Sequence, residues 1–141
     1  MILPTTYLLH ITLRKPRYIK IGKLGSFTFQ KGNYIYVGSA KKNMEKRIAR
    51  HFKRIKKKFW HIDYLLQYAK VKEVWLSNFS EEKLARILSE KLKIPVSGFG
   101  SSDKRSKSHL FYGKLDKNLL NFLNLRNLLS HRCNQGFMSI S

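Results

Sequence analysis

Residues 32–40 read GNYIYVGSA, and residues 47–51 read RIARH. The first block alternates tyrosines with β-branched residues between two glycines, which is typical of a strand bounded by turns. The second block lies in a segment where apolar residues recur at helical spacing, and Asn43 is the expected N-cap. The apolar stripe of this helix comprises Met44, Ile48, Phe52 and Ile55. We therefore expect a strand followed by a helix at the centre of the fold.

Further strands and helices are expected on both sides of this unit. The expected strands are residues 7–13, 18–21, 26–29, 71–76 and 110–112, and the expected helices are residues 61–69, 80–92 and 116–131. Short connections in the first half favour an antiparallel meander. The fold class is α+β, with a small antiparallel β-sheet, flanking helices and a C-terminal helix. We expect one domain over residues 1–115 and a helical extension over 116–141 that packs on it.

The charge of the chain points to a polyanionic partner. Its 141 residues include 29 Lys and Arg against 8 Asp and Glu, which gives a net charge of +21. Nucleic acid is the first choice, because basic side chains displace its condensed counterions. No apolar run approaches the roughly 18 residues of a spanning helix, so no membrane partner is expected. The single cysteine, Cys133, excludes a multi-cysteine zinc site, and a cytoplasmic location is expected.

Several blocks of the chain resemble a known nuclease superfamily. The strand end Tyr36-Val37-Gly38 and the helix segment at 47–51 are similar to the second half of the GIY-YIG signature. The first half falls on Thr5-Thr6-Tyr7, with Thr in place of the leading Gly. Further blocks, at residues 59–66, 98–103 and 108–112, resemble a small archaeal and bacterial branch that is sometimes fused to glycosylases of the endonuclease III type. The resemblance covers roughly residues 5 to 113.

The resemblance implies hydrolysis of a DNA phosphodiester bond with Mg²⁺ or Mn²⁺ as the cofactor. It gives Tyr7 the role of general base, and Tyr36 the positioning of water or phosphate. Arg47 would direct its guanidinium at the phosphate. Taken from the residues alone, a tyrosine in a sheet is also a core residue, and for Tyr7 the two interpretations stand level.

The metal ligand is the point where the chain departs from the superfamily. The position of the expected carboxylate falls on Lys83, and Glu81 and Glu82 precede it. One residue along a helix rotates a side chain by about 100°. Both acids also fit a structural role, because acids in the first turn are stabilised by the helix dipole. We take Glu82 as the best candidate ligand.

A basic surface is expected to contact nucleic acid. Its candidate residues are Lys41, Lys42, Arg50, His51, Arg54, Lys57, Lys58, Lys104 and Arg105. The basic run from Arg50 to Lys58 is expected to extend the helix that carries Arg47. The segment 104–107 is either a phosphate-contacting loop or a charged surface turn. His61 and Asp63 are interpreted as a hydrogen-bonded structural pair.

Two functions remain open on the sequence. The first is a metal-dependent endonuclease that acts on DNA. The alternative is a catalytically degenerate, non-enzymatic protein that binds DNA or RNA. DNA is the partner that the resemblance favours, although no residue distinguishes it from RNA. The oligomeric state is also left open.

Overall fold

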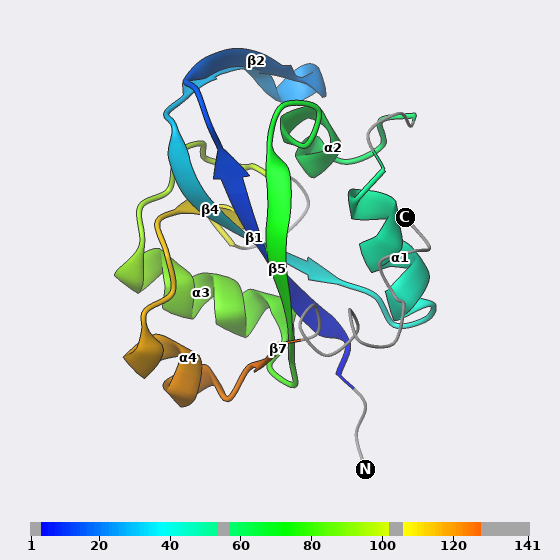
Figure 1. The fold of residues 1–141 in the computed structure, drawn as a ribbon, viewed down its shortest axis with the longest axis vertical. Helices are drawn as coiled ribbons and strands as arrows, with labels where there is room; N and C mark the ends of the chain where they lie inside the picture. The colour runs from blue at the N-terminus through cyan, green and yellow to red at the C-terminus, as the bar shows by residue number, and fades with distance from the viewer. Residues whose placement is uncertain (1–3, 54–56, 102–105, 128–141) are drawn as a thin grey trace.

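The computed structural model describes residues 4–53, 57–101 and 106–127. A central antiparallel sheet has the strand order β6-β4-β1-β5-β7 (Figure 1). Its strands are β1 (Thr6–Leu13), β4 (Gly32–Ser39), β5 (Lys70–Ser77), β6 (Leu110–Tyr112) and β7 (Arg126–Asn127). The helices are α1 (Met44–His51), α2 (His61–Leu65), α3 (Glu81–Lys91) and α4 (Lys117–Leu123). The expected α+β class with an antiparallel sheet is confirmed.

The expected meander is wrong, because the second and third strands leave the central sheet. Strands β2 (Arg17–Ile21) and β3 (Gly25–Phe29) pair with each other, joined by the 3₁₀ turn η1 (Gly22–Leu24). Strand β1 pairs instead with β4 on one side and β5 on the other. The burial pattern explains the difference. In β2 only Ile19 and Ile21 are buried, so the β2-β3 ribbon packs on the protein with one face and leaves the other exposed. Strand β1 is buried on both of its faces and therefore lies inside the central sheet.

Two apolar clusters lie on opposite faces of the sheet. Successive side chains of a strand point to opposite faces, so Leu9 of β1 joins one cluster and Leu8 joins the other. On the first face the sheet packs against α1, α2 and the β2-β3 ribbon through residues that include Ile48, Ile62 and Phe29. On the second face it packs against α3 and α4 through residues that include Leu84, Leu88 and Leu119. The molecule therefore has three layers, and the two helix pairs lie on opposite sides of the sheet.

Two helices end earlier than the sequence pattern predicts. The C-terminal helix ends at Leu123 rather than near residue 131, because Asn124 adopts a left-handed conformation with φ 51°. Residues 128–141 lie outside the described part of the chain. Helix α1 ends at His51, and the next two backbone N–H groups, of Phe52 and Lys53, bond three residues back rather than four. Helix α1 thus ends within the basic run, and residues 54–56 of that run lie outside the described part of the chain.

A close contact between β1 and β4 fixes the start of the sheet. Tyr7 stands opposite Gly38 in the register of the two strands. A methyl group on Gly38 would lie 2.5 Å from both Cζ and the hydroxyl oxygen of Tyr7. The Tyr7 ring therefore lies flat against the β4 backbone, in space that only glycine leaves open.

We predict that Gly38→Ala destabilises the fold by about 1–3 kcal/mol, the usual cost of overpacking a core. The Tyr7 ring cannot move aside easily, since its hydroxyl is hydrogen-bonded to α1. Chemical denaturation of wild type, Gly38→Ala, Tyr7→Ala and the double variant would measure the effect. The double variant should lose less stability than the sum of the two single variants, because Gly38→Ala causes no clash once the Tyr7 ring is removed. An unchanged unfolding free energy in Gly38→Ala would contradict the close contact.

Candidate functional site

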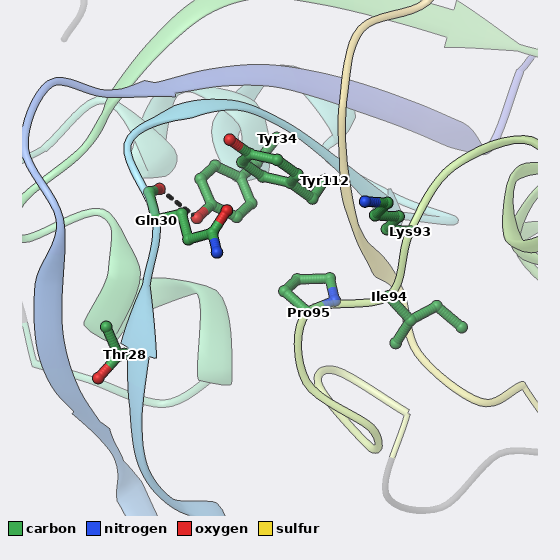
Figure 2. Close-up of a pocket in the computed structure, with 7 residues that line it drawn as sticks. All are labelled: Thr28, Gln30, Tyr34, Lys93, Ile94, Pro95 and Tyr112. Atoms are coloured by element: carbon green, nitrogen blue, oxygen red, sulfur yellow. Dashed lines mark hydrogen bonds between the residues drawn. The ribbon is translucent and has the colours of Figure 1, made fainter.

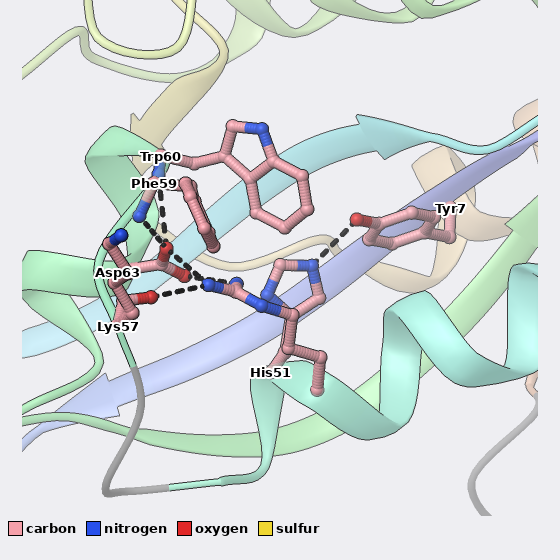
Figure 3. A network of polar contacts seen from close by, with 7 residues as sticks. Tyr7, His51, Lys57, Phe59, Trp60 and Asp63 are labelled. Carbon is pink, nitrogen blue, oxygen red and sulfur yellow. Dashed lines mark hydrogen bonds and ion pairs between the residues drawn. The ribbon is translucent and has the colours of Figure 1, made fainter.

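The three expected catalytic residues lie together beneath the first face of the sheet. The Tyr7 hydroxyl and His51 Nε2 are 2.6 Å apart, which joins β1 to the last turn of α1 (Figure 3). The Tyr36 ring makes an edge contact with the His51 ring, with centroids 6.1 Å apart. Arg47 donates from Nη1 to the carbonyl oxygen of Ser39 at 2.7 Å, just after Gly38. Strands β1 and β4 and helix α1 thus bring four side chains into one cluster, which we call the tyrosine–histidine cluster (Tyr7, Tyr36, Arg47 and His51).

Burial sets the protonation of the two phenols. Tyr7 is 2% exposed and Tyr36 is 8% exposed. Burial raises the pKa of Tyr7 well above its usual value, and the charge of Tyr36 raises it further, while Arg47 lowers it. Burial likewise raises the pKa of Tyr36, and Arg47 again opposes the rise. Both phenols therefore keep their protons at neutral pH, so Tyr7 can donate its O–H to His51.

Of the two adjacent acids of α3, Glu81 and not Glu82 acts on the pKa values of the cluster. The charge of Glu81 raises the pKa of both Tyr7 and Tyr36, so it lies within electrostatic range of both hydroxyls. Its Oε2 is 3.5 Å from Nδ1 of the buried His109. Glu82 is exposed. The structure therefore favours Glu81 over Glu82 as the acid beside the cluster: Ser80 caps α3 by accepting from the Lys83 N–H, and that register turns Glu81 inward.

A buried ion pair connects α1 to α2. The Asp63 carboxylate accepts from Arg50 Nη1 at 2.8 Å and from Nη2 at 3.0 Å. It also accepts from the backbone N–H groups of Phe59 and Trp60 (Figure 3). Burial by itself raises the pKa of Asp63, but the hydrogen bonds from Arg50 and the two backbone groups outweigh it and hold the pKa below its usual value. Arg50 also donates to the carbonyl oxygen of Lys57 at 2.7 Å.

The Arg50–Asp63 pair revises two expectations. Arg50, expected to contact nucleic acid, is engaged in a fork-to-fork pair within the protein. Asp63 bonds to Arg50 rather than to His61, and His61 Nδ1 accepts from the Gly100 N–H at 2.8 Å. The interpretation of His61 and Asp63 as a mutual pair is therefore wrong. Thirteen residues separate Arg50 from Asp63, so no local spacing indicated the contact.

Aromatic rings and cations are stacked outward from the cluster. The His51 ring lies 6.2 Å from the Trp60 ring. The guanidinium of Arg50 lies 4.5 Å from the centre of Trp60 and 5.5 Å from the centre of Phe59. Arg47 also covers Trp60, at 4.8 Å. Trp60 is thus partly buried and is contacted by two arginines.

The remaining basic candidates differ in their positions. His51, which we expected to contact nucleic acid, is buried and faces Tyr7. Lys41, Lys42, Lys57 and Lys58 are exposed. Arg54, Lys104 and Arg105 lie outside the described residues. The exposed lysines flank α1 in sequence on both sides and are available to solvent anions.

Two cavities lie near the first face of the sheet. One, of about 260 Å³, is next to the cluster, since His51 lines it together with Lys53 and Lys70. The other, of about 220 Å³, includes none of the cluster residues (Figure 2). It is lined by Thr28, Gln30, Tyr34, Lys93, Ile94, Pro95 and Tyr112. Only the first cavity therefore places lysine side chains next to the cluster.

Within the described ranges, no three His, Cys, Asp or Glu side chains gather as a preformed metal site.

We predict that Asp63→Asn costs about 3 kcal/mol of unfolding free energy at neutral pH, because it leaves Arg50 without its charged partner. The lowered pKa of Asp63 means that its stabilisation is present above the ordinary carboxyl pKa of about 4 and is lost as the pH falls through the lower folded value. The stability gap between wild type and Asp63→Asn should therefore shrink in acid. Urea denaturation at several pH values measures it, with the exposed Glu90→Gln as control. A gap that is constant with pH would contradict the ion pair.

Comparison with known proteins gives one family. No curated protein and no solved structure matches the chain. In the part of the chain that the structure describes, no helix has the length and apolar character needed to cross a membrane. A family model described as a domain of unknown function, DUF123, matches residues 6–129. This range includes both strands and the helix that form the tyrosine–histidine cluster, and the chain belongs to the DUF123 family.

Proposed function

We propose that the protein is a GIY-YIG-type endonuclease that hydrolyses phosphodiester bonds of DNA. The observation that carries the proposal is the Tyr7–His51 contact of 2.6 Å, flanked by a cation, Arg47, and an acid, Glu81. Phosphodiester hydrolysis needs a proton acceptor for the attacking water, a cation for the phosphate and a means of orienting both. The cluster supplies one candidate for each requirement.

The proton acceptor is the Tyr7–His51 pair acting as a unit. A phenol with a raised pKa is a poor direct source of a phenolate at neutral pH. In the proposed step, water gives its proton to the Tyr7 oxygen while the Tyr7 proton passes to His51 Nε2. The new bond forms between the water oxygen and phosphorus as the bond to the leaving oxygen breaks. This step requires a neutral His51 whose Nε2 carries no hydrogen.

The phosphate is held by Arg47 and by charges outside the cluster. Arg47 lies beside the two phenols, and its guanidinium keeps donors beyond the one that bonds Ser39. Lys53 and Lys70 flank the cavity next to His51. A single carboxylate suits Mg²⁺ or Mn²⁺, since Mg²⁺ is commonly held by one or two carboxylates together with water and substrate phosphate. Glu81 would hold such an ion, which would neutralise developing charge on the phosphate.

A second candidate function is nucleic-acid binding without cleavage. The burial of Tyr7, which is 2% exposed, favours this second function. A water molecule reaches the Tyr7 hydroxyl only if neighbouring side chains shift when substrate binds. In this second function the Tyr7–His51 contact is a structural link between β1 and α1. The two functions differ in whether the protein cleaves DNA, and in the first function cleavage depends on Glu81.

We predict salt-sensitive binding to duplex DNA with little sequence preference. The net charge of +21 and the exposed lysines beside α1 favour contacts to roughly five to eight phosphates. The logarithm of the binding constant should then fall against the logarithm of salt concentration with a slope of about −4 to −7. Fluorescence anisotropy over a salt series measures the slope. A flat response would contradict binding through phosphates.

We predict metal-dependent nicking of plasmid DNA that is lost in Glu81→Gln and kept in Glu82→Gln. The two substitutions remove the same charge from adjacent residues of α3, but only Glu81 is in range of the phenols. Glu81→Gln should lower the cleavage rate roughly 100-fold or more, because an ion that stabilises transition-state charge contributes several kcal/mol. DNA affinity measured without metal should change little in either variant.

Three outcomes of this experiment decide between the functions. Loss of cleavage in Glu81→Gln alone supports the endonuclease and the assignment of its ligand. Equal losses in both variants would refute the assignment of Glu81. Salt-sensitive DNA binding with no cleavage by wild type, in Mg²⁺ or Mn²⁺, would establish the second function.

A further inference from the structure

The surface beside the tyrosine–histidine cluster carries an exposed aromatic ring. Phe59 is 68% exposed, although it is a large apolar residue. It follows the exposed Lys57 and Lys58 in the chain. Lys57 Nζ lies 5.6 Å from the centre of the Phe59 ring. Exposed rings combined with cations form the stacking platforms by which proteins hold unpaired nucleotides.

The position of Phe59 is fixed by the protein. Its backbone N–H donates to Asp63 Oδ2 at 2.8 Å. Its ring lies on the guanidinium of Arg50, which the two bonds to Asp63 hold in place. A ring held in this way loses little conformational entropy when a ligand stacks on it. Figure 3 shows Phe59 and Trp60 side by side above Asp63, with His51 and Tyr7 beyond them.

We propose that Phe59 is a stacking site for an unpaired nucleobase, with Lys57 and Lys58 contacting the adjoining phosphates. The proposal rests on the proposed function and narrows its substrate to DNA that carries a single-stranded segment. A chain of ring contacts links Phe59 to the tyrosine–histidine cluster. Arg50 touches both Phe59 and Trp60, and Trp60 touches His51, so a base on Phe59 lies close to the candidate catalytic residues. The interior of a duplex offers no base face there, because its bases are stacked on one another.

Three DNA probes of equal duplex length test this site. The first is a blunt duplex, the second carries a single-stranded overhang, and the third carries an abasic overhang with the same phosphates. Wild-type protein should bind the overhang more tightly than the abasic overhang by about 5- to 150-fold, the range for one base stacked on an aromatic ring. This comparison needs no variant and so is independent of folding.

Two substitutions assign the effect to Phe59. Phe59→Ala should abolish the difference between the normal and abasic overhangs and leave binding to the blunt duplex within about twofold, since one duplex contact through a solvated residue contributes little. Phe59→Trp should preserve the difference, because the ring is retained. Phe122→Ala is the matched control: Phe122 is also 68% exposed, but it lies on α4, in the layer on the opposite face of the sheet.

The outcomes separate this proposal from the proposed function. Equal binding of the normal and abasic overhangs by wild type would overturn the stacking site and leave duplex binding intact. An undiminished difference in Phe59→Ala, or an equal loss in Phe122→Ala, would also overturn it. Binding to none of the three DNAs would overturn both. If Phe59→Ala instead lost affinity for phosphatidylserine vesicles and kept the overhang difference, the ring would belong to a membrane contact.

Discussion

The buried carboxylate of Asp63 is the constraint on which the functional side of the molecule depends. It accepts from both terminal nitrogens of Arg50 and from two backbone N–H groups. These bonds hold the end of α1 and the start of α2 together, although the like charges of the basic run repel one another. They also place Trp60 against His51, so the orientation of the histidine that bonds Tyr7 depends on an acid twelve residues further along the chain. Charges in the interior cost much desolvation, and the bidentate geometry and the backbone donors offset that cost here.

The described basic residues in and beside α1 divide into two groups with different physical roles. Arg47 and Arg50 turn inward, where the planar guanidinium bonds Ser39 or Asp63 and covers Trp60. The lysines of the neighbouring segments remain exposed as point charges. The difference follows from the side chains themselves, because a guanidinium is less strongly hydrated than an ammonium and binds in two directions at once. The net charge of +21 therefore overstates the charge that is free to bind a polyanion.

The sequence predicts where the strands and helices lie along the chain better than it predicts which strands pair with one another. Alternating apolar residues predict the strands, because that pattern is a local property of the chain. The departure of β2 and β3 from the sheet depends on which residues are buried on two faces rather than one, and this is a tertiary property. The same limit applies to the site. Tyr7, Tyr36 and Arg47 were found from short motifs, whereas the choice between Glu81 and Glu82 rests on a rotation of about 100°. Only the placement of α3 beside His109 settles that rotation.

The chemistry of the cluster begins with the absence of a side chain at Gly38. The Tyr7 ring can lie against the β4 backbone only because no Cβ stands there, and this position carries the hydroxyl across to His51 on α1. Burial then raises the pKa of Tyr7, so the phenol keeps its proton and can donate it in a hydrogen bond to an imidazole whose Nε2 carries no hydrogen. A tyrosine in that state is a poor base by itself but a good conductor of a proton, because its oxygen can gain one proton while its own passes to the histidine. In the proposed function the imidazole is the group that finally takes the proton, and the tyrosine extends its reach to the sheet. Any larger residue at Gly38 would push the Tyr7 ring away from this position. The packing of the two strands and the proposed proton path through Tyr7 therefore both depend on the space that a Cβ at Gly38 would fill.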